Sequence, residues 1–168
     1  EQEGAFSFIE INHEVCRSSE QLLAVLSHEI MHKYLRMHGL SYSSELENEI
    51  LTDVATIYTG LGKLTLNGVY AEYMKYEGNT LVTSIQKIGY LTIESFCFIY
   101  LLLCKLRGLP VSTNELNDNV IAVLHEVENS QLYSDISLQI DDDENELLRI
   151  EDSFKAQHSK SEADIESK

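Results

Sequence analysis

Apolar residues dominate a stretch near the start of the chain. Ser18 and Gln21 form a capping box, the pattern that begins a helix, and Gly39 is suited to end one. The segment Gln21–Leu35 is strongly apolar through Leu22, Leu23, Val25, Leu26, Ile30, Met31 and Leu35. The pattern predicts a mostly buried helix that runs to about His38.

A second capping box follows at Ser44 and Glu47 and predicts a helix over Glu45–Thr59. Gly60-Leu61-Gly62 is a stop signal for it. This helix is also largely apolar, with Ile50, Leu51, Val54, Ala55 and Ile57. We therefore expect it to be partly buried as well.

The segment Lys63–Leu81 is less regular. Asn67-Gly68 between short apolar runs favours a hairpin turn. The three tyrosines that follow have the spacing of a helix instead: Tyr70, Tyr73 and Tyr76. Both interpretations stay open for this segment.

The most apolar segment is Thr92–Arg107. Glu94 near its start and Lys105 at its end leave about ten uncharged residues between them, whereas a membrane span needs ~20. We therefore predict the central buried helix of the domain rather than a membrane helix. Ser112 with Glu115 then predicts a further helix up to about Asn129.

The segment Ala5–Ile11 alternates at its end and contains aromatic and β-branched residues, which is typical of a strand. With four helical segments and one such strand, the predicted fold is mainly α, of the α+β class. We expect one domain over residues 1–132. Residues 133–168 are polar and acidic and predict a weakly ordered tail in which Glu146–Lys155 can form a short helix.

The chain has 168 residues and a formal net charge of −16. This charge argues against binding to nucleic acid or to an anionic membrane. The three cysteines, Cys16, Cys97 and Cys104, are an odd number without metal-site spacing, and predict reduced, partly buried thiols in a cytoplasmic protein. The chain has no secretory signal and begins with Glu, so we expect a fragment or processed product, with an upstream domain or partner protein possible.

The predicted first helix contains His28-Glu29-Ile30-Met31-His32, an HExxH motif. His28 and His32 lie one turn apart on one face and can aim two imidazoles at one metal ion. Glu29 can reach a metal-bound water, which is the zinc-and-base arrangement of metallopeptidases. Solvated histidines on a polar face are the alternative, but the helix is too apolar to favour it.

A third ligand is available on the predicted second helix. Glu49 and Asp53 are four residues apart and share a face. Glu49 is a natural third zinc ligand, and Asp53 can accept a hydrogen bond from the free ring nitrogen of a zinc-binding histidine. A solvated acidic face is the alternative in so acidic a chain.

The spacing HExxH followed by Asn48-Glu49-Ile50-Leu51-Thr52-Asp53 resembles the gluzincin branch of zinc metallopeptidases over about Ser19–Gly62. The resemblance implies a zincin-like helical core in which the HExxH helix packs on an ExxxD helix, with the N-terminal strand as an edge strand. It implies Zn²⁺ held by His28, His32 and Glu49, with Glu29 as general base and Asp53 supporting a ligand histidine. Thr52 stands where serine is usual.

His38 is a rival third ligand, because a histidine six residues after HExxH is the spacing of metzincins. That family has glycine three residues after the second histidine, where this chain has Leu35. If the helix continues, His38 lies about 120° round the axis from His32 and cannot share its metal. We therefore expect His38 to sit at the helix end, just before the turn at Gly39.

The predicted activity is zinc-dependent hydrolysis of peptide bonds in a peptide or protein substrate, with Glu29 activating a zinc-bound water. An oxyanion donor is normally needed as well; Tyr90, Tyr100 and His125 are candidates, and the sequence does not choose among them. Two alternatives remain. The first is a non-catalytic zincin-like regulatory or interaction module, and the second is a metal-free helix pair held by buried ion pairs.

Overall fold

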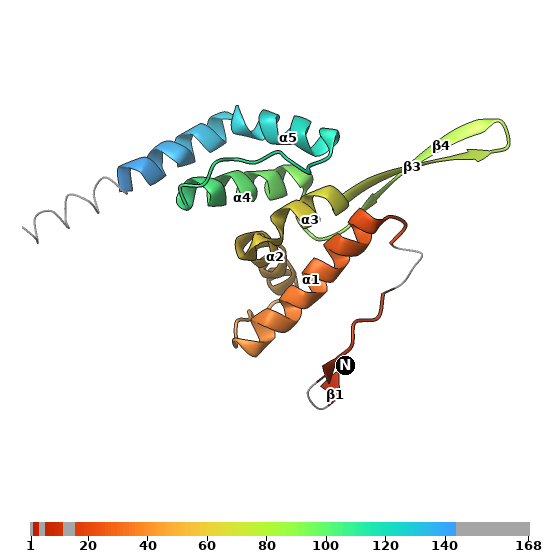
Figure 1. Ribbon diagram of the computed structural model, residues 1–168, viewed down its shortest axis with the longest axis horizontal. Coiled ribbons are helices and arrows are strands. Elements are labelled where there is room, and N and C mark those ends of the chain that lie inside the picture. Colours follow the sequence, from red (N-terminus) through yellow and green to blue (C-terminus); the bar gives the residue numbers. More distant parts are fainter. Residues whose placement is uncertain (1, 4–5, 12–15, 144–168) are drawn as a thin grey trace, which may run out of the picture. The chain divides into compact units, whose positions relative to one another are not determined.

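The computed structural model describes residues 2–3, 6–11 and 16–143 (Figure 1). The chain divides into two compact units, Glu1–Glu128 and Asn129–Lys168. This boundary falls close to the predicted one at residue 132. In the second unit residues 131–143 form a helix where the sequence predicted a weakly ordered tail. The predicted helix over Glu146–Lys155 lies outside the described residues.

Mainly helical structure is confirmed. Helix α1 spans Ser19–Met37, with Ser18 as its N-cap and its hydroxyl accepting the Gln21 backbone N–H at 3.2 Å. At the other end Gly39 has φ +67°, and the Leu40 N–H bonds back to the Leu35 carbonyl at 3.0 Å. This is the hydrogen-bond pattern by which a left-handed glycine closes a helix.

Helix α2 spans Glu45–Thr56 and is capped by Ser44, as predicted, but it ends before Thr59. A π-helical turn, η1 (Ile57–Leu61), follows, and within it Gly60 has φ +97° and kinks the chain. A short helix, α3 (Gly62–Gly68), then begins. Gly60, where the sequence predicted the end of a helix, is therefore a bend. The helical conformation resumes directly after it, in α3.

The hairpin predicted at Asn67-Gly68 is misplaced. Those two residues end α3, and the hairpin comes next: β3 (Tyr70–Glu77) pairs antiparallel with β4 (Thr80–Lys87). Its turn is at Gly78-Asn79, and the ribbon extends from the helices (Figure 1). The helical interpretation of the three tyrosines is wrong as well, because all three lie on β3.

The N-terminal strand is shorter than predicted. Strand β1 (Gln2–Glu3) pairs with β2 (Phe6–Ser7), and residues 8–11 that follow are not in a strand. Residue 5 of the predicted strand lies outside the described residues. The short β2 pairs with β1 alone within the described part of the chain.

Helix α4 (Ile93–Leu106) follows the prediction, with Thr92 as N-cap. Helix α5 (Asp118–Glu128) begins later than the predicted start at Ser112. The later start is caused by a tertiary contact. The side chain of Asn67 donates to the Glu115 carbonyl and accepts the Asn117 N–H, which holds the residues just before α5 against α3. Glu115 itself has φ +70°, a conformation incompatible with a helix.

Helix α4 supplies the centre of the core, as its composition predicted. It packs on α5, and α1 packs on both α3 and α2. The fully buried apolar side chains come from α1, α3, α4 and α5 and include Ala24, Leu66, Phe96, Leu101 and Leu124. None of the helices in the described residues is long and apolar enough to cross a membrane.

The crossing of α1 and α3 depends on a residue without a side chain. A Cβ added at Gly68 would collide with the backbone carbonyl of Glu20 and with the Ala24 side chain. Helix propensity alone predicts that alanine at this position would stabilise the protein by up to ~1 kcal/mol. We predict the opposite sign: Gly68→Ala lowers the free energy of unfolding by about 2 kcal/mol, because the helices must move apart. Urea unfolding of the two proteins measures it, and an unchanged or raised stability would contradict this packing.

The three cysteines are free, and Cys97 and Cys104 are buried on α4. Burial raises the pKa of Cys97 to about 12, and it also raises the pKa of Cys104. Only the thiolate reacts, so Cys97 stays unreactive at pH 8. We predict that a disulfide reagent labels partly exposed Cys16 quickly and Cys97 only after unfolding in guanidinium. Fast labelling of Cys97 in the folded protein would contradict the α4 packing.

Candidate metal centre

Three side-chain atoms converge between α1 and α2. Glu49 Oε2 lies 3.0 Å from His28 Nε2 and 3.1 Å from His32 Nε2. The potential ligand atoms of these three residues all lie within 4.8 Å of one another. Among the described residues, this is the cluster of potential metal ligands that has at least three members. The HExxH and ExxxD spacing predicted these three residues as metal ligands, and the packing of α1 on α2 brings them together.

The spacing of these atoms fits a small metal ion. Zinc bonds of ~2.0–2.1 Å at the tetrahedral angle place ligand atoms roughly 3.3 Å apart. The separations from Glu49 Oε2 to the two histidine nitrogens are within a few tenths of an ångström of that value. Two imidazoles and one carboxylate are also a donor set that zinc favours, and three protein ligands leave one coordination position for water or substrate. The residues therefore fit the metal that the sequence implies.

Asp53 is hydrogen-bonded to the ring of the first histidine. Its Oδ1 lies 2.9 Å from His28 Nδ1, and its side chain is only 2% exposed. The other oxygen, Oδ2, accepts the backbone N–H groups of Tyr90 at 2.8 Å and Leu91 at 3.1 Å. When Nδ1 of the neutral His28 ring donates its proton to Asp53, Nε2 carries the lone pair and could bind a metal that Glu49 also holds.

The loop that follows β4 is shaped to reach this carboxylate. Gly89 has φ +83°, and a Cβ there would lie 3.1 Å from Asp53 Oδ1. Only glycine combines this backbone conformation with so close an approach to a side chain. The contact of this loop with Asp53 was not predicted from the sequence. The one feature that pointed to a special backbone conformation there is a glycine just ahead of the apolar helix α4.

Thr52 is hydrogen-bonded to the ring of the second histidine, a role that the sequence pattern did not assign to it. Its hydroxyl donates to the Asn48 carbonyl at 2.8 Å and lies 3.1 Å from His32 Nδ1. The hydroxyl proton is donated to the Asn48 carbonyl, so the hydroxyl oxygen must accept the hydrogen bond from His32 Nδ1–H. In a neutral ring this arrangement leaves Nε2 free to bind a metal. The missed signal is a threonine three residues after Glu49, inside an otherwise apolar run.

Asn48 fixes the connection between the two helices. Its amide oxygen accepts the Tyr42 N–H at 2.7 Å, and its amide nitrogen donates to the carbonyls of Tyr42 and Ser44, both at 2.9 Å. The loop is thereby tied to the first turn of α2, next to Glu49. The compact connection between His32 and Glu49 is possible because this side chain makes the turn's hydrogen bonds.

The electrostatics of His28 reflect both carboxylates. Burial by itself lowers the pKa of His28, but the hydrogen bonds and negative charges of Asp53 and Glu49 outweigh it and raise the pKa above its usual value. His28 is therefore held in a strongly negative environment. Such an environment also attracts a metal cation.

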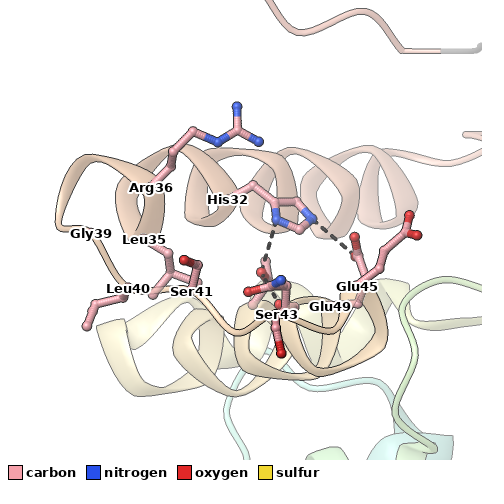
Figure 2. Close-up of a pocket in the computed structure, with 11 residues that line it drawn as sticks. His32, Leu35, Arg36, Gly39, Leu40, Ser41, Ser43, Glu45 and Glu49 are labelled. Carbon is pink, nitrogen blue, oxygen red and sulfur yellow. Dashed lines mark hydrogen bonds and ion pairs between the residues drawn. The ribbon is translucent and has the colours of Figure 1, made fainter.

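A cavity of about 460 Å³ opens beside the cluster, between α1 and the loop that leads to α2. His32 and Glu49 form part of its wall, and Figure 2 shows the His32 ring pointing from α1 towards Glu49 on α2. The side chains of His32 and Glu49 are 24% and 18% exposed. The ligand atoms are thus accessible to an incoming molecule.

Glu29 lies on α1 next to His28 and is exposed. Within the described residues its carboxylate forms no hydrogen bond or ion pair. The side chain is therefore available to solvent or to a bound molecule. A general base needs a carboxylate that is not already bonded to another group, and Glu29 meets this requirement. No described residue fixes the position of its carboxylate.

The remaining candidates lie elsewhere or are already engaged. His38 is the C-cap of α1, with its ring against Tyr34, and is not one of the three clustered residues. The Tyr100 hydroxyl donates to the Ser112 carbonyl, and His125 pairs with Glu128 on α5. Of the three oxyanion candidates, Tyr90 alone reaches the cluster, and it does so through its backbone N–H to Asp53.

No protein family, curated protein or solved structure matches this chain in the three comparisons made.

The Thr52 hydrogen bond can be tested against a neighbour in the same helix. We predict that Thr52→Val weakens zinc binding by about 10–100-fold, because His32 loses the acceptor that orients it. Thr52→Ser keeps the hydroxyl and should bind zinc nearly as tightly as the unaltered chain. Competition with a fluorescent zinc chelator measures the three affinities.

Thr56→Val is the matched control. Thr56 is equally buried and donates to the Thr52 carbonyl at 2.7 Å, so its loss affects the same helix. It touches neither histidine, and its zinc affinity should stay unchanged. Equal losses of zinc affinity in Thr52→Val and Thr56→Val would show that helix stability, rather than the His32 bond, is responsible.

Proposed function

We propose that this chain is a zinc-dependent metallopeptidase domain that hydrolyses peptide bonds in a peptide or protein substrate. The observation that carries the proposal is the convergence of His28 Nε2, His32 Nε2 and Glu49 Oε2. Each histidine has its other ring nitrogen bonded, to Asp53 and to Thr52. Catalytic zinc sites share this arrangement of three protein ligands supported by outer hydrogen bonds.

The resemblance to gluzincins supports the same assignment. Its pattern places the two histidines on one helix and the glutamate and aspartate on a second, and these are the residues that meet between α1 and α2. In that family the residue corresponding to Glu29 is the general base. The proposal therefore assigns metal binding to His28, His32 and Glu49, and proton transfer to Glu29.

The chemistry follows from these positions. Zinc, when bound, acts as a Lewis acid that acidifies water and polarises a carbonyl group. The Glu29 carboxylate accepts a proton from water as the water oxygen bonds to the substrate carbonyl carbon. Glu29 then delivers that proton to the amide nitrogen, the carbon–nitrogen bond breaks, and an amine and a carboxylic acid are released.

The cavity beside the cluster provides space for substrate. At about 460 Å³ it lies within the range of small-ligand pockets and is large enough for a side chain or two of a peptide. His32 and Glu49 form its wall, so a peptide seated there would have a carbonyl group close to the cluster.

A second candidate is a non-catalytic module that binds zinc and a protein partner. Two of the three oxyanion candidates, Tyr100 and His125, make bonds away from the cluster, and Glu29 is not held by any other described residue. A site with metal ligands but no fixed oxyanion donor would bind without rapid turnover.

The Glu29→Gln variant separates the two functions. Glutamine keeps the shape and cannot accept the proton, so we predict that zinc content is retained and cleavage falls by about 10²–10⁴-fold. Fluorescein-labelled casein and a mixture of peptides, read by mass spectrometry for new termini, are the substrates. Glu47→Gln, an exposed substitution of the same kind on α2, should cleave at the original rate.

Each result has a separate meaning. Equal cleavage by the Glu29→Gln variant and the unaltered chain would remove Glu29 from the mechanism. An unaltered chain that holds one zinc and leaves casein and all peptides intact would favour the non-catalytic module. A chain that holds no zinc after metal-replete purification would contradict both.

A further inference from the structure

A second cavity of about 520 Å³ lies on the other side of the turn that follows α2. Its walls come from η1, α3, α4 and the segment 109–115, and none of the three clustered metal-binding residues lines it. Its lining is mostly apolar, with Ile57, Leu64, Leu103, Leu109 and Pro110. The volume is within the range of pockets that hold small molecules.

Two cations border this apolar space. Lys63 Nζ donates to Ser112 Oγ at 3.0 Å and to the Asn114 carbonyl at 2.8 Å. Arg107 lies over the Tyr58 ring, 4.4 Å from its centroid, and Nη2 donates to the Tyr58 carbonyl at 2.7 Å. All of these acceptors and the ring are uncharged.

Neither cation is neutralised by a carboxylate in the described part of the chain. That is unexpected in a protein with 28 acidic and 12 basic residues, where acidic partners are abundant. Their field reaches into the cavity: burial raises the pKa of the Cys104 thiol in its wall, and the charges of Lys63 and Arg107 act to lower it. A cation beside an apolar surface attracts an anion more strongly than one in water does.

Both cations also have donors to spare. A lysine ammonium has three donors, and Lys63 uses two of them. An arginine guanidinium has five, arranged to match a carboxylate, and Arg107 uses Nη2 for the Tyr58 carbonyl. Both side chains line the same cavity, and each keeps N–H donors that can bind a carboxylate oxygen there while its present hydrogen bonds stay in place.

We propose that this cavity binds a small molecule with an apolar body and a single carboxylate, the body lying against the apolar wall and the carboxylate between Lys63 and Arg107. Glu115 also lines the cavity and would repel a second negative charge. A monocarboxylate therefore suits the site better than a phosphate ester or a nucleotide. The proposal does not depend on zinc or on peptidase activity.

Paired ligands test the charge recognition. We expect octanoate and 4-phenylbutyrate to bind saturably, measured by isothermal titration calorimetry, and their neutral amides to bind about tenfold more weakly or worse. Lys63→Gln and Arg107→Gln should each weaken carboxylate binding by about the same factor and leave amide binding little changed. Arg17→Gln removes an equal charge outside the cavity and should have no effect.

A third variant tests the location. Leu64 is 38% exposed at the cavity rim, so Leu64→Trp can place an indole over the space without disturbing the core. It should abolish binding of both carboxylates while the thermal unfolding midpoint stays close to that of the unaltered protein. Equal binding of acids and amides, unchanged affinity in both cation variants, or no saturable binding at millimolar ligand would each overturn the proposal.

Discussion

The buried carboxylate of Asp53 is the interaction on which the rest of the structure depends. Burying a charge is costly unless hydrogen bonds compensate for it, and here three hydrogen bonds come from two other parts of the chain. His28 supplies one from α1, and the backbone N–H groups of Tyr90 and Leu91 supply two from the loop after the hairpin. One side chain on α2 therefore fixes α1 and the entrance to α4, and Gly89 is the residue that lets the loop come so close.

The geometry of the candidate metal centre follows from that constraint. With His28 Nδ1 directed at Asp53, the Nε2 atom faces Glu49, one turn earlier on α2. Thr52 directs His32 in the same way. Without metal, two carboxylates and two histidines form a hydrogen-bonded network. In the proposed zinc site, the same ring orientations would offer two lone pairs and a carboxylate to one ion, so little rearrangement would be needed to bind it.

The sequence predicted the parts of the structure whose causes are local. Capping residues and apolar periodicity placed α1, α2 and α4, and the four-residue spacing on two helices identified the candidate ligands and Asp53. The sequence did not predict α3, the position of the hairpin, the start of α5 or the role of Thr52. The start of α5 and the role of Thr52 depend on contacts distant in sequence: Asn67 holds the segment before α5, and Thr52 finds its partner 20 residues away on another helix. A local pattern does not say which distant residue such a side chain will meet.

Zinc K-edge X-ray absorption of the purified, zinc-loaded protein would show whether His28, His32 and Glu49 hold a metal. The proposed site predicts one zinc per chain, a first shell of nitrogen and oxygen at ~2.0–2.1 Å, and the outer-shell scattering of two imidazole rings. Replacing His32 with alanine should reduce the imidazole signal to that of one ring. A sulfur shell at ~2.3 Å, or a spectrum of hydrated zinc without imidazole, would contradict it.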